Sequence, residues 1–223
     1  MIHIDSLIEH IAPHSCLGCG RNGPLLCSTC SDEYFEQIQP RCVGCKRLSD
    51  HFKVCTNCRS WLPLQSVRVS ANYEGIAEAL VHSLKFDCRR AAAGPIAQLM
   101  ASQIVDSDGT LLCPIPTAPS RVRQRGFDHA LHITKRLSRH TKVPYQQLLR
   151  RHTNVRQLGA SRLNRIRQME REFEAIKQGE IKGKHVILVD DVFTTGATLS
   201  AAAKVLRKAG ARRVSAVVFA QKV

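Results

Sequence analysis

Two adjacent carboxylates are placed where they could take part in chemistry. Asp190 and Asp191 follow a run of four apolar residues, 186–189, and precede a small, hydroxyl-rich segment, 194–198. A continuous apolar run is typical of a strand buried on both faces of a parallel sheet, and the Ala-rich segment 199–209 is typical of a helix. Ligands of open α/β sheets bind at the carboxyl ends of strands. We therefore expect a binding site at this point of the chain.

The residue types in this segment suit a sugar phosphate. A helix start offers unpaired backbone N–H groups and partial positive charge, which favour a phosphate. Three threonines add hydroxyl donors, and Gly196 allows the backbone to approach a ligand closely or to take a positive φ. Two carboxylates would repel a phosphate, but they suit the hydroxyls of a ribose or a Mg²⁺ ion held through water.

The whole string VILVDDVFTTGATL resembles the phosphoribosyl-pyrophosphate (PRPP) motif of type I phosphoribosyltransferases. The resemblance implies an α/β fold, with a parallel sheet flanked by helices, and PRPP bound together with Mg²⁺. It places Asp190 and Asp191 at the catalytic position against the ribose hydroxyls. The 5′-phosphate would be held by Thr194, Thr195, Gly196, Ala197 and Thr198.

Four CxxC pairs lie within residues 16–58, where a CxxC turn can present two thiolates to a tetrahedral Zn²⁺. In a cytosolic chain this many cysteines favour metal binding over disulfides. We expect two structural zinc ions; redox CxxC motifs and an Fe–S cluster are the alternatives. The spacing does not decide the pairing. We favour sequential sets over an interleaved cross-brace, namely Cys16, Cys19, Cys27 and Cys30 on one ion, and Cys42, Cys45, Cys55 and Cys58 on the other. A closed Cys₄ site leaves no open position for catalysis.

A basic motif follows a predicted strand at residues 111–115. Three prolines stiffen the next segment, and Arg121, Arg123 and Arg125 then alternate along the chain. On a loop, such arginines could bind a diphosphate through bidentate contacts, whereas the simpler interpretation is a solvated basic turn.

Residues 114–130 also resemble the ComF family, whose pattern is close to PxPxxxxRxRxRGFNQA. This chain has Asp128 and His129 where that family usually has Asn and Gln. ComF proteins also carry a Cys-rich zinc module and the PRPP motif, so the resemblance covers nearly the whole chain. It implies a role in uptake or processing of transforming single-stranded DNA, with a helicase-like ATPase as partner. Among the ten histidines, only His129 and His152 fall in a plausible site.

The positive charge is concentrated in one stretch. The formal net charge is +15, of which +12 comes from residues 121–171, whereas residues 1–63 are neutral overall. This distribution favours a polyanionic partner. We expect Arg162, Arg165 and Arg167 to contact single-stranded DNA through its phosphates, since few aromatic residues lie among them. The segment 150–171 also resembles the flexible loop that closes over the active site in type I phosphoribosyltransferases.

The segment 60–66, which contains Pro63, is the expected domain boundary. It separates a double zinc-ribbon module, 1–62, from a phosphoribosyltransferase-like domain, 63–223. No run of about 18 apolar residues occurs, and the first residues include acids without a basic segment, so we expect a cytoplasmic protein without membrane insertion.

Three functions remain open from the sequence. The first is the ComF-like role with a ribose-phosphate site. The second is an active phosphoribosyltransferase of nucleotide metabolism, which the lack of a recognisable nucleobase hood disfavours. The third is a zinc-ribbon adaptor for a helicase-like partner, and the intact PRPP motif favours ligand binding over such a purely structural role.

Overall fold

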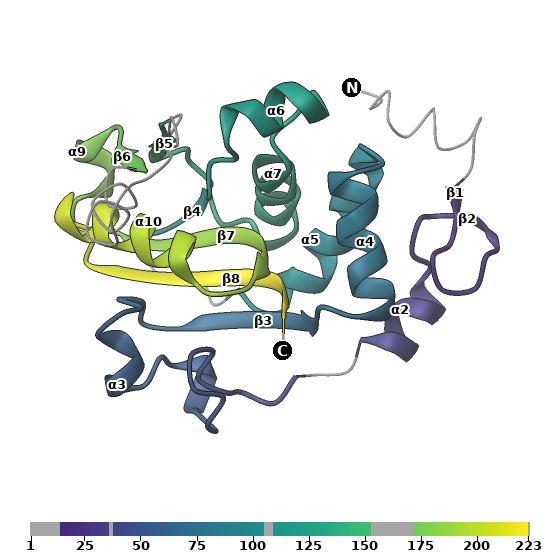
Figure 1. Ribbon diagram of the computed structural model, residues 1–223, viewed down its shortest axis with the longest axis horizontal. Helices are drawn as coiled ribbons and strands as arrows, with labels where there is room; N and C mark the ends of the chain where they lie inside the picture. Colours follow the sequence, from purple (N-terminus) through teal and green to yellow (C-terminus); the bar gives the residue numbers. More distant parts are fainter. Residues whose placement is uncertain (1–13, 36–37, 105–108, 153–171, 223) are drawn as a thin grey trace, which may run out of the picture.

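The computed structural model describes residues 14–35, 38–104, 109–152 and 172–222. Within this part of the chain the central sheet has four parallel strands in the order β3-β8-β7-β4 (Figure 1). The predicted α/β fold with a parallel sheet is therefore confirmed. The strands are β3 (Val67–Asn72), β4 (Thr110–Pro114), β7 (His185–Phe193) and β8 (Arg213–Gln221).

Helices cover both faces of the sheet, as the apolar character of its central strands requires. On β7, Ile187 and Val189 belong to one hydrophobic cluster, whereas Val186 and Leu188 belong to another, because successive side chains of a strand point to opposite faces. Three helices cover the first face: α4 (Gly75–Lys85), α5 (Ala93–Ala101) and α7 (His129–Thr141). The helix α10 (Ala197–Lys208) covers the second face.

Shorter elements complete the α/β part. The 3₁₀ turn η2 (Arg90–Ala92) precedes α5, and α6 (Pro119–Arg125) follows β4. Strands β5 (Leu149–Arg151) and β6 (Phe173–Ala175) pair antiparallel, and the short helix α9 (Gln178–Ile181) leads into β7. Before β5, Tyr145 forms an isolated bridge with Leu112 on β4.

The two Cys-rich segments pack against opposite faces of the sheet. The first contains β1 (His14–Ser15), β2 (Asn22–Gly23) and α2 (Ser28–Tyr34), and its Cys16 and Cys30 join the cluster under α4. The second contains η1 (Asp50–Phe52) and α3 (Thr56–Arg59), and its Cys42 and Cys58 join the cluster under α10. The described residues 38–41, which lead into the second segment, pass the edge strand β3 (Figure 1).

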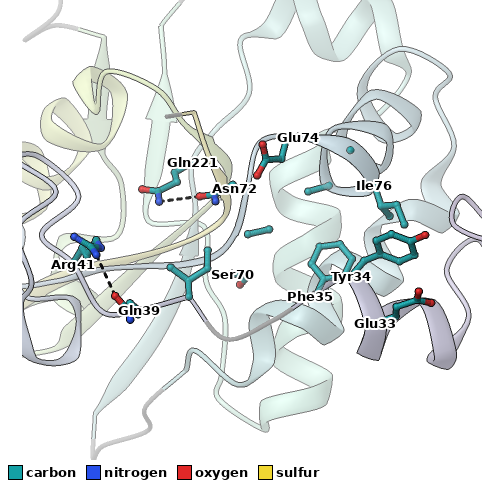
Figure 2. A pocket seen from close by; sticks show the side chains of 14 residues that line it. Glu33, Tyr34, Phe35, Gln39, Arg41, Ser70, Asn72, Glu74, Ile76 and Gln221 are labelled. Carbon is teal, nitrogen blue, oxygen red and sulfur yellow. Dashed lines mark hydrogen bonds between the residues drawn. The ribbon is translucent and has the colours of Figure 1, made fainter.

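A hollow of about 610 Å³ marks this crossing (Figure 2). Phe35 and Ile76 line it on the side of the first Cys-rich segment, and Asn72 and Gln221 line it at the ends of β3 and β8. The Gln221 amide donates to Asn72 Oδ1 at 3.2 Å and accepts from Lys46 Nζ at 2.9 Å. The second Cys-rich segment is thus tied to the carboxyl ends of the strands.

The domain boundary at residues 62 and 63 remains a prediction. In the structure, residues on both sides of it share the same hydrophobic clusters; Leu62 and Leu64 pack with residues of α10 and β8. No helix within the described ranges is long and apolar enough to cross a bilayer.

Leu62→Ala should lower the free energy of unfolding by about 2–5 kcal/mol, because it opens a cavity between the second Cys-rich segment and α10. Leu62 is 0% exposed, whereas Leu48 in the same segment is 71% exposed and serves as the matched control. Leu48→Ala should change stability by no more than about 0.5 kcal/mol. Urea denaturation measures both, and equal effects would show that Leu62 does not join the two parts.

Candidate functional site

The predicted acid pair lies inside β7 rather than just after it. The strand continues to Phe193 because Val192 and Phe193 still pair with Ala220 and Gln221 of β8. Asp191 is only 3% exposed, while Asp190 is half-buried. The Asp190 carboxylate accepts a hydrogen bond from the Asp191 backbone N–H at 2.9 Å.

Two nitrogen-bearing side chains from different helices converge on Asp191. Lys85, the last residue of α4, places its Nζ 2.8 Å from each carboxylate oxygen and donates a hydrogen bond to Oδ1. His129, the first residue of α7, places its Nε2 3.0 Å from Oδ2. Neither nitrogen makes a well-aligned hydrogen bond to Oδ2, although both lie within about 3 Å of it. The carboxylate is therefore held from both sides.

The two acids consequently differ in protonation. Burial, reinforced by the neighbouring Asp191 charge, raises the pKa of Asp190 to about 7. Burial also pushes the pKa of Asp191 upward, but His129 and Lys85 together outweigh it and hold that pKa below its ordinary value. Asp191 is thus a permanent charge at neutral pH.

A hydrogen-bond network sets the orientation of His129. Its Nδ1 lies 3.1 Å from Thr117 Oγ1 and 3.1 Å from a guanidinium nitrogen of Arg125. The Thr117 hydroxyl donates to Asp128 at 2.9 Å, and Asp128 also caps α7 by accepting from the Leu131 N–H. Since Arg125 can only donate, the neutral ring accepts at Nδ1 and carries its proton on Nε2, facing Asp191.

The predicted phosphate loop forms the connection from β7 to α10. Thr194 and Thr195 are exposed, and Ala197 and Thr198 are half-buried. Gly196 has a φ of 74°, and a Cβ there would lie 2.9 Å from the Phe193 ring, so both conformation and space require glycine. The helix begins at Ala197, two residues earlier than predicted, so the loop residues stand directly at its amino end.

The prediction of an arginine loop is wrong, because residues Pro119–Arg125 form the helix α6. Pro119 presets φ at the first helical position, and Gly126 ends the helix in the left-handed conformation with a φ of 76°. At about 100° per residue, Arg121 and Arg125 share one face, and Arg123 lies on the other.

Among these arginines, only Arg125 reaches the surroundings of the acid pair. It contacts His129 and lies over the Phe86 ring at 5.7 Å. Burial lowers its pKa, and the charge of Asp191 counteracts that effect. Arg121 and Arg123 are exposed.

The two Cys₄ sets are assembled sequentially, as favoured from the sequence. Within each set, the four sulfur atoms lie within 4.8 Å of one another; the sets are Cys16, Cys19, Cys27 and Cys30, and Cys42, Cys45, Cys55 and Cys58. The Cys19 and Cys27 sulfurs are 3.9 Å apart, and those of Cys45 and Cys55 are 3.7 Å apart. Tetrahedral thiolates at metal–sulfur distances of about 2.3 Å would be about 3.8 Å apart, so both sets fit such a metal.

The backbone around each set favours thiolates. Burial raises the pKa of Cys16 and Cys42, but backbone N–H groups outweigh it and lower both pKa values to about 6. A Cβ at Gly18 would lie 2.6 Å from the Cys30 sulfur, and one at Gly44 would lie 2.8 Å from the Cys58 sulfur. Glycine is therefore needed where the turn wraps the sulfur atoms.

Some predicted residues stay untested by this geometry. Arg162, Arg165 and Arg167 lie outside the described residues. His152 is exposed and approaches Glu174 at 3.3 Å, not the acid pair.

Lys85 was not identified as a site residue from the sequence, where its only signal is its position as the last residue of an amphipathic helix.

Comparison with known proteins agrees with this arrangement. The family model "Phosphoribosyl transferase domain" matches residues 128–223. "Competence protein F" of Haemophilus influenzae is 29% identical over 213 residues, covering 89% of this chain and 90% of the relative. "Competence protein ComFC" of Streptococcus pneumoniae is 28% identical, covering 85% and 84%, respectively. "DNA utilization protein YhgH" of Escherichia coli is 26% identical, covering 85% and 87%.

The chain is thus similar to ComF-type competence and DNA utilization proteins over most of its length, and to a phosphoribosyltransferase domain over residues 128–223. The acid pair, the threonine loop and His129 all fall inside the matched phosphoribosyltransferase segment. Lys85 lies before that segment, in a helix that the family model does not cover.

Lys85→Met should reduce the free energy of unfolding by about 3 kcal/mol, because it leaves the buried Asp191 carboxylate without its lysine partner and with only the His129 ring beside it. Adding Asp191→Asn should recover part of this loss, since a neutral amide no longer needs the lysine. The exposed Lys208 ends α10 as Lys85 ends α4, so Lys208→Met is the control and should be nearly neutral. Denaturant unfolding of the wild type, Lys85→Met, Asp191→Asn and the double variant gives the coupling energy; a value near zero would contradict the ion pair.

Proposed function

We propose that this chain is a ComF-like protein that binds PRPP, or a closely related sugar phosphate, at the carboxyl end of β7 and acts in uptake or processing of transforming single-stranded DNA. The observation that carries the first part is the acid pair of β7 standing directly before the Gly196 turn at the start of α10. The names of the relatives, competence and DNA utilization proteins, support the second part.

Different residues of the site suit the two ends of the proposed ligand. The exposed hydroxyls of Thr194 and Thr195 and the first N–H groups of α10 suit the 5′-phosphate. The half-buried carboxylate of Asp190 suits the ribose hydroxyls, and Asp191 is fixed behind it by Lys85 and His129. Arg125, close to His129, adds positive charge on the side where a diphosphate would lie.

Metal ions have two separate roles in this proposal. Zn²⁺ would occupy both Cys₄ sets as a structural ion, since four thiolates at tetrahedral spacing are its preferred ligands. Mg²⁺ would enter with PRPP, where the oxygen atoms of Asp190 and Asp191 lie within 4.8 Å of each other. When bound, Mg²⁺ would neutralise diphosphate charge; the protein's own residues orient the ribose.

The proposed DNA role rests on the strongly basic character of the chain and includes a protein partner. A formal net charge of +15 favours phosphate backbones, and the single-stranded DNA would be passed on by a helicase-like ATPase. We place the protein in the cytoplasm, because thiol clusters of this type persist in reducing compartments.

An active phosphoribosyltransferase is the second candidate. The intact acid pair and phosphate loop favour it, and in that case PRPP would be consumed with release of pyrophosphate. Incubation with PRPP, Mg²⁺ and candidate acceptors would release pyrophosphate only if this candidate is right.

Purified protein should contain two zinc ions per chain, because neither Cys-rich segment has enough apolar surface to fold without its metal. Cys45→Ser should reduce the content to about one ion, since it removes a single thiolate from one set. Cys88→Ser, at an exposed cysteine outside both sets, is the control and should keep two. Elemental analysis measures the ratio, and iron in place of zinc would refute the metal assignment.

PRPP with Mg²⁺ should bind to the wild type, and Asp190→Asn should weaken the affinity by about 10- to 100-fold, because a neutral amide loses a charge-assisted contact of about 1.5–3 kcal/mol. Asp190→Asn combined with Asp191→Asn should abolish binding. Asp32→Asn removes an exposed acid of α2, outside the acid pair, and should leave affinity unchanged. Isothermal calorimetry on folded variants measures this, and unaltered binding by the double variant would rule out the acid pair as the site.

A further inference from the structure

A second charged surface lies at the amino ends of the strands, away from the acid pair. Two adjoining hollows of about 290 Å³ and 190 Å³ share Lys53, Gln65 and Arg213 as lining residues. Arg59 and Arg207 line the larger hollow, and Arg68 lines the smaller one. We term this continuous surface, defined by Lys53, Arg59, Arg68, Arg207 and Arg213, the basal groove.

The fold holds the walls of the groove in place through the backbone. His185 and Arg213 are the first residues of β7 and β8 and lie opposite each other in the register. Residues of the second Cys-rich segment fold back onto the start of β3; the Val54 N–H donates to the Gln65 carbonyl at 3.0 Å. The Gln65 N–H in turn donates to the Val214 carbonyl at 2.8 Å. The groove is therefore a rigid junction between the metal-binding segment and the sheet.

The charges in the groove are not neutralised by acids. Arg59 donates to the Val54 carbonyl at 2.9 Å, and Arg207 donates to the Arg212 carbonyl at 3.4 Å. Arg68 lies over the Phe52 ring at 5.9 Å. Among the described residues, no carboxylate lines either hollow. The groove thus presents an uncompensated positive field.

His185 lines the smaller hollow and lies beside these charges. Its Nε2 lies 3.0 Å from Ser215 Oγ, while its buried Nδ1 has no hydrogen-bond partner in the described structure. Burial, with the nearby charges of Arg213 and Arg212, lowers the pKa of His185. A bound anion would compensate these charges, and the shape and chemistry of the groove decide which kind of anion.

We propose that the basal groove binds the phosphodiester backbone of single-stranded DNA. The identity of this partner rests on the proposed function; the location rests on the groove itself. Two adjoining open hollows suit a chain of phosphates better than one compact anion. No Phe, Tyr or Trp side chain lines the hollows in the described residues, so the contacts would be to phosphates and not to stacked bases.

The groove and the sugar-phosphate site lie at opposite ends of β7. His185 and Asp190 are five residues apart on a strand, which corresponds to about 17 Å. A DNA strand in the groove would therefore leave the acid pair accessible. Both ligands should bind to the same molecule at once.

Fluorescence anisotropy with a labelled oligothymidylate at low salt tests the proposal on the full chain. The test variant is Lys53→Gln with Arg213→Gln, because both side chains are exposed and make no hydrogen bond or ion pair among the described residues. Its affinity should fall by about tenfold, and the slope of log K against log salt should become shallower by about 1.4, which corresponds to two lost phosphate contacts.

The matched control is Arg21→Gln with Arg47→Gln. These exposed arginines occupy equivalent positions in the two Cys-rich turns, where their carbonyls accept from Cys16 and Cys42, and neither lines the groove. The control removes the same charge and should change affinity by less than about twofold, with the salt slope unchanged. Zinc content and the melting temperature of both variants should match the wild type.

Three outcomes would overturn the groove assignment while leaving the proposed function intact. They are an unaltered affinity of the test variant, an equal loss in test and control variants, and displacement of the DNA by saturating PRPP with Mg²⁺. If wild-type protein itself failed to bind the oligonucleotide at low salt, the DNA part of the proposed function would fail, and this inference with it.

Discussion

A buried negative charge constrains the rest of this structure. Removing the Asp191 carboxylate from water costs several kcal/mol unless cations and hydrogen-bond donors replace the solvent. Lys85 and His129 provide that replacement from the end of α4 and the start of α7. Satisfying one carboxylate therefore fixes two helices against β7, and through Thr117, Asp128 and Arg125 it also fixes the segment that carries α6. The half-buried Asp190 then faces its ligand from a rigid base.

The Cys₄ sets play a comparable role for the sheet. Each segment is too short to form its own core, and each contributes buried sulfur and apolar side chains to one face of the α/β part. A metal at each set would link cysteines from two turns, so that a few residues hold a defined shape. Because the sets contact opposite faces, they brace the edge strand β3 from both sides.

Much of this fold could be predicted from local patterns. The apolar runs of β7 and β8 mark strands buried on both faces, and the CxxC spacing marks the thiolate sets. Which pairs share a metal could not be deduced, because it depends on how the turns fold back. The arginines alternate with a period of two, which obscured α6, although Pro119 and Gly126 are the residues that begin and end such a helix. Lys85 needed tertiary structure, since its partner is 106 residues away in the chain.

The pairing of β3 with β8 has a consequence for synthesis of the protein. Asn72 at the end of β3 meets Gln221 at the end of β8 across 149 residues of chain. At translation rates of about 5–20 residues per second, roughly 7–30 seconds separate the emergence of the two strands. During that interval β3 and the cysteine turns have emerged from the ribosome without the sheet on which they pack. Early metal loading would keep the reactive thiols of the nascent chain from wrong pairings until the last strand arrives.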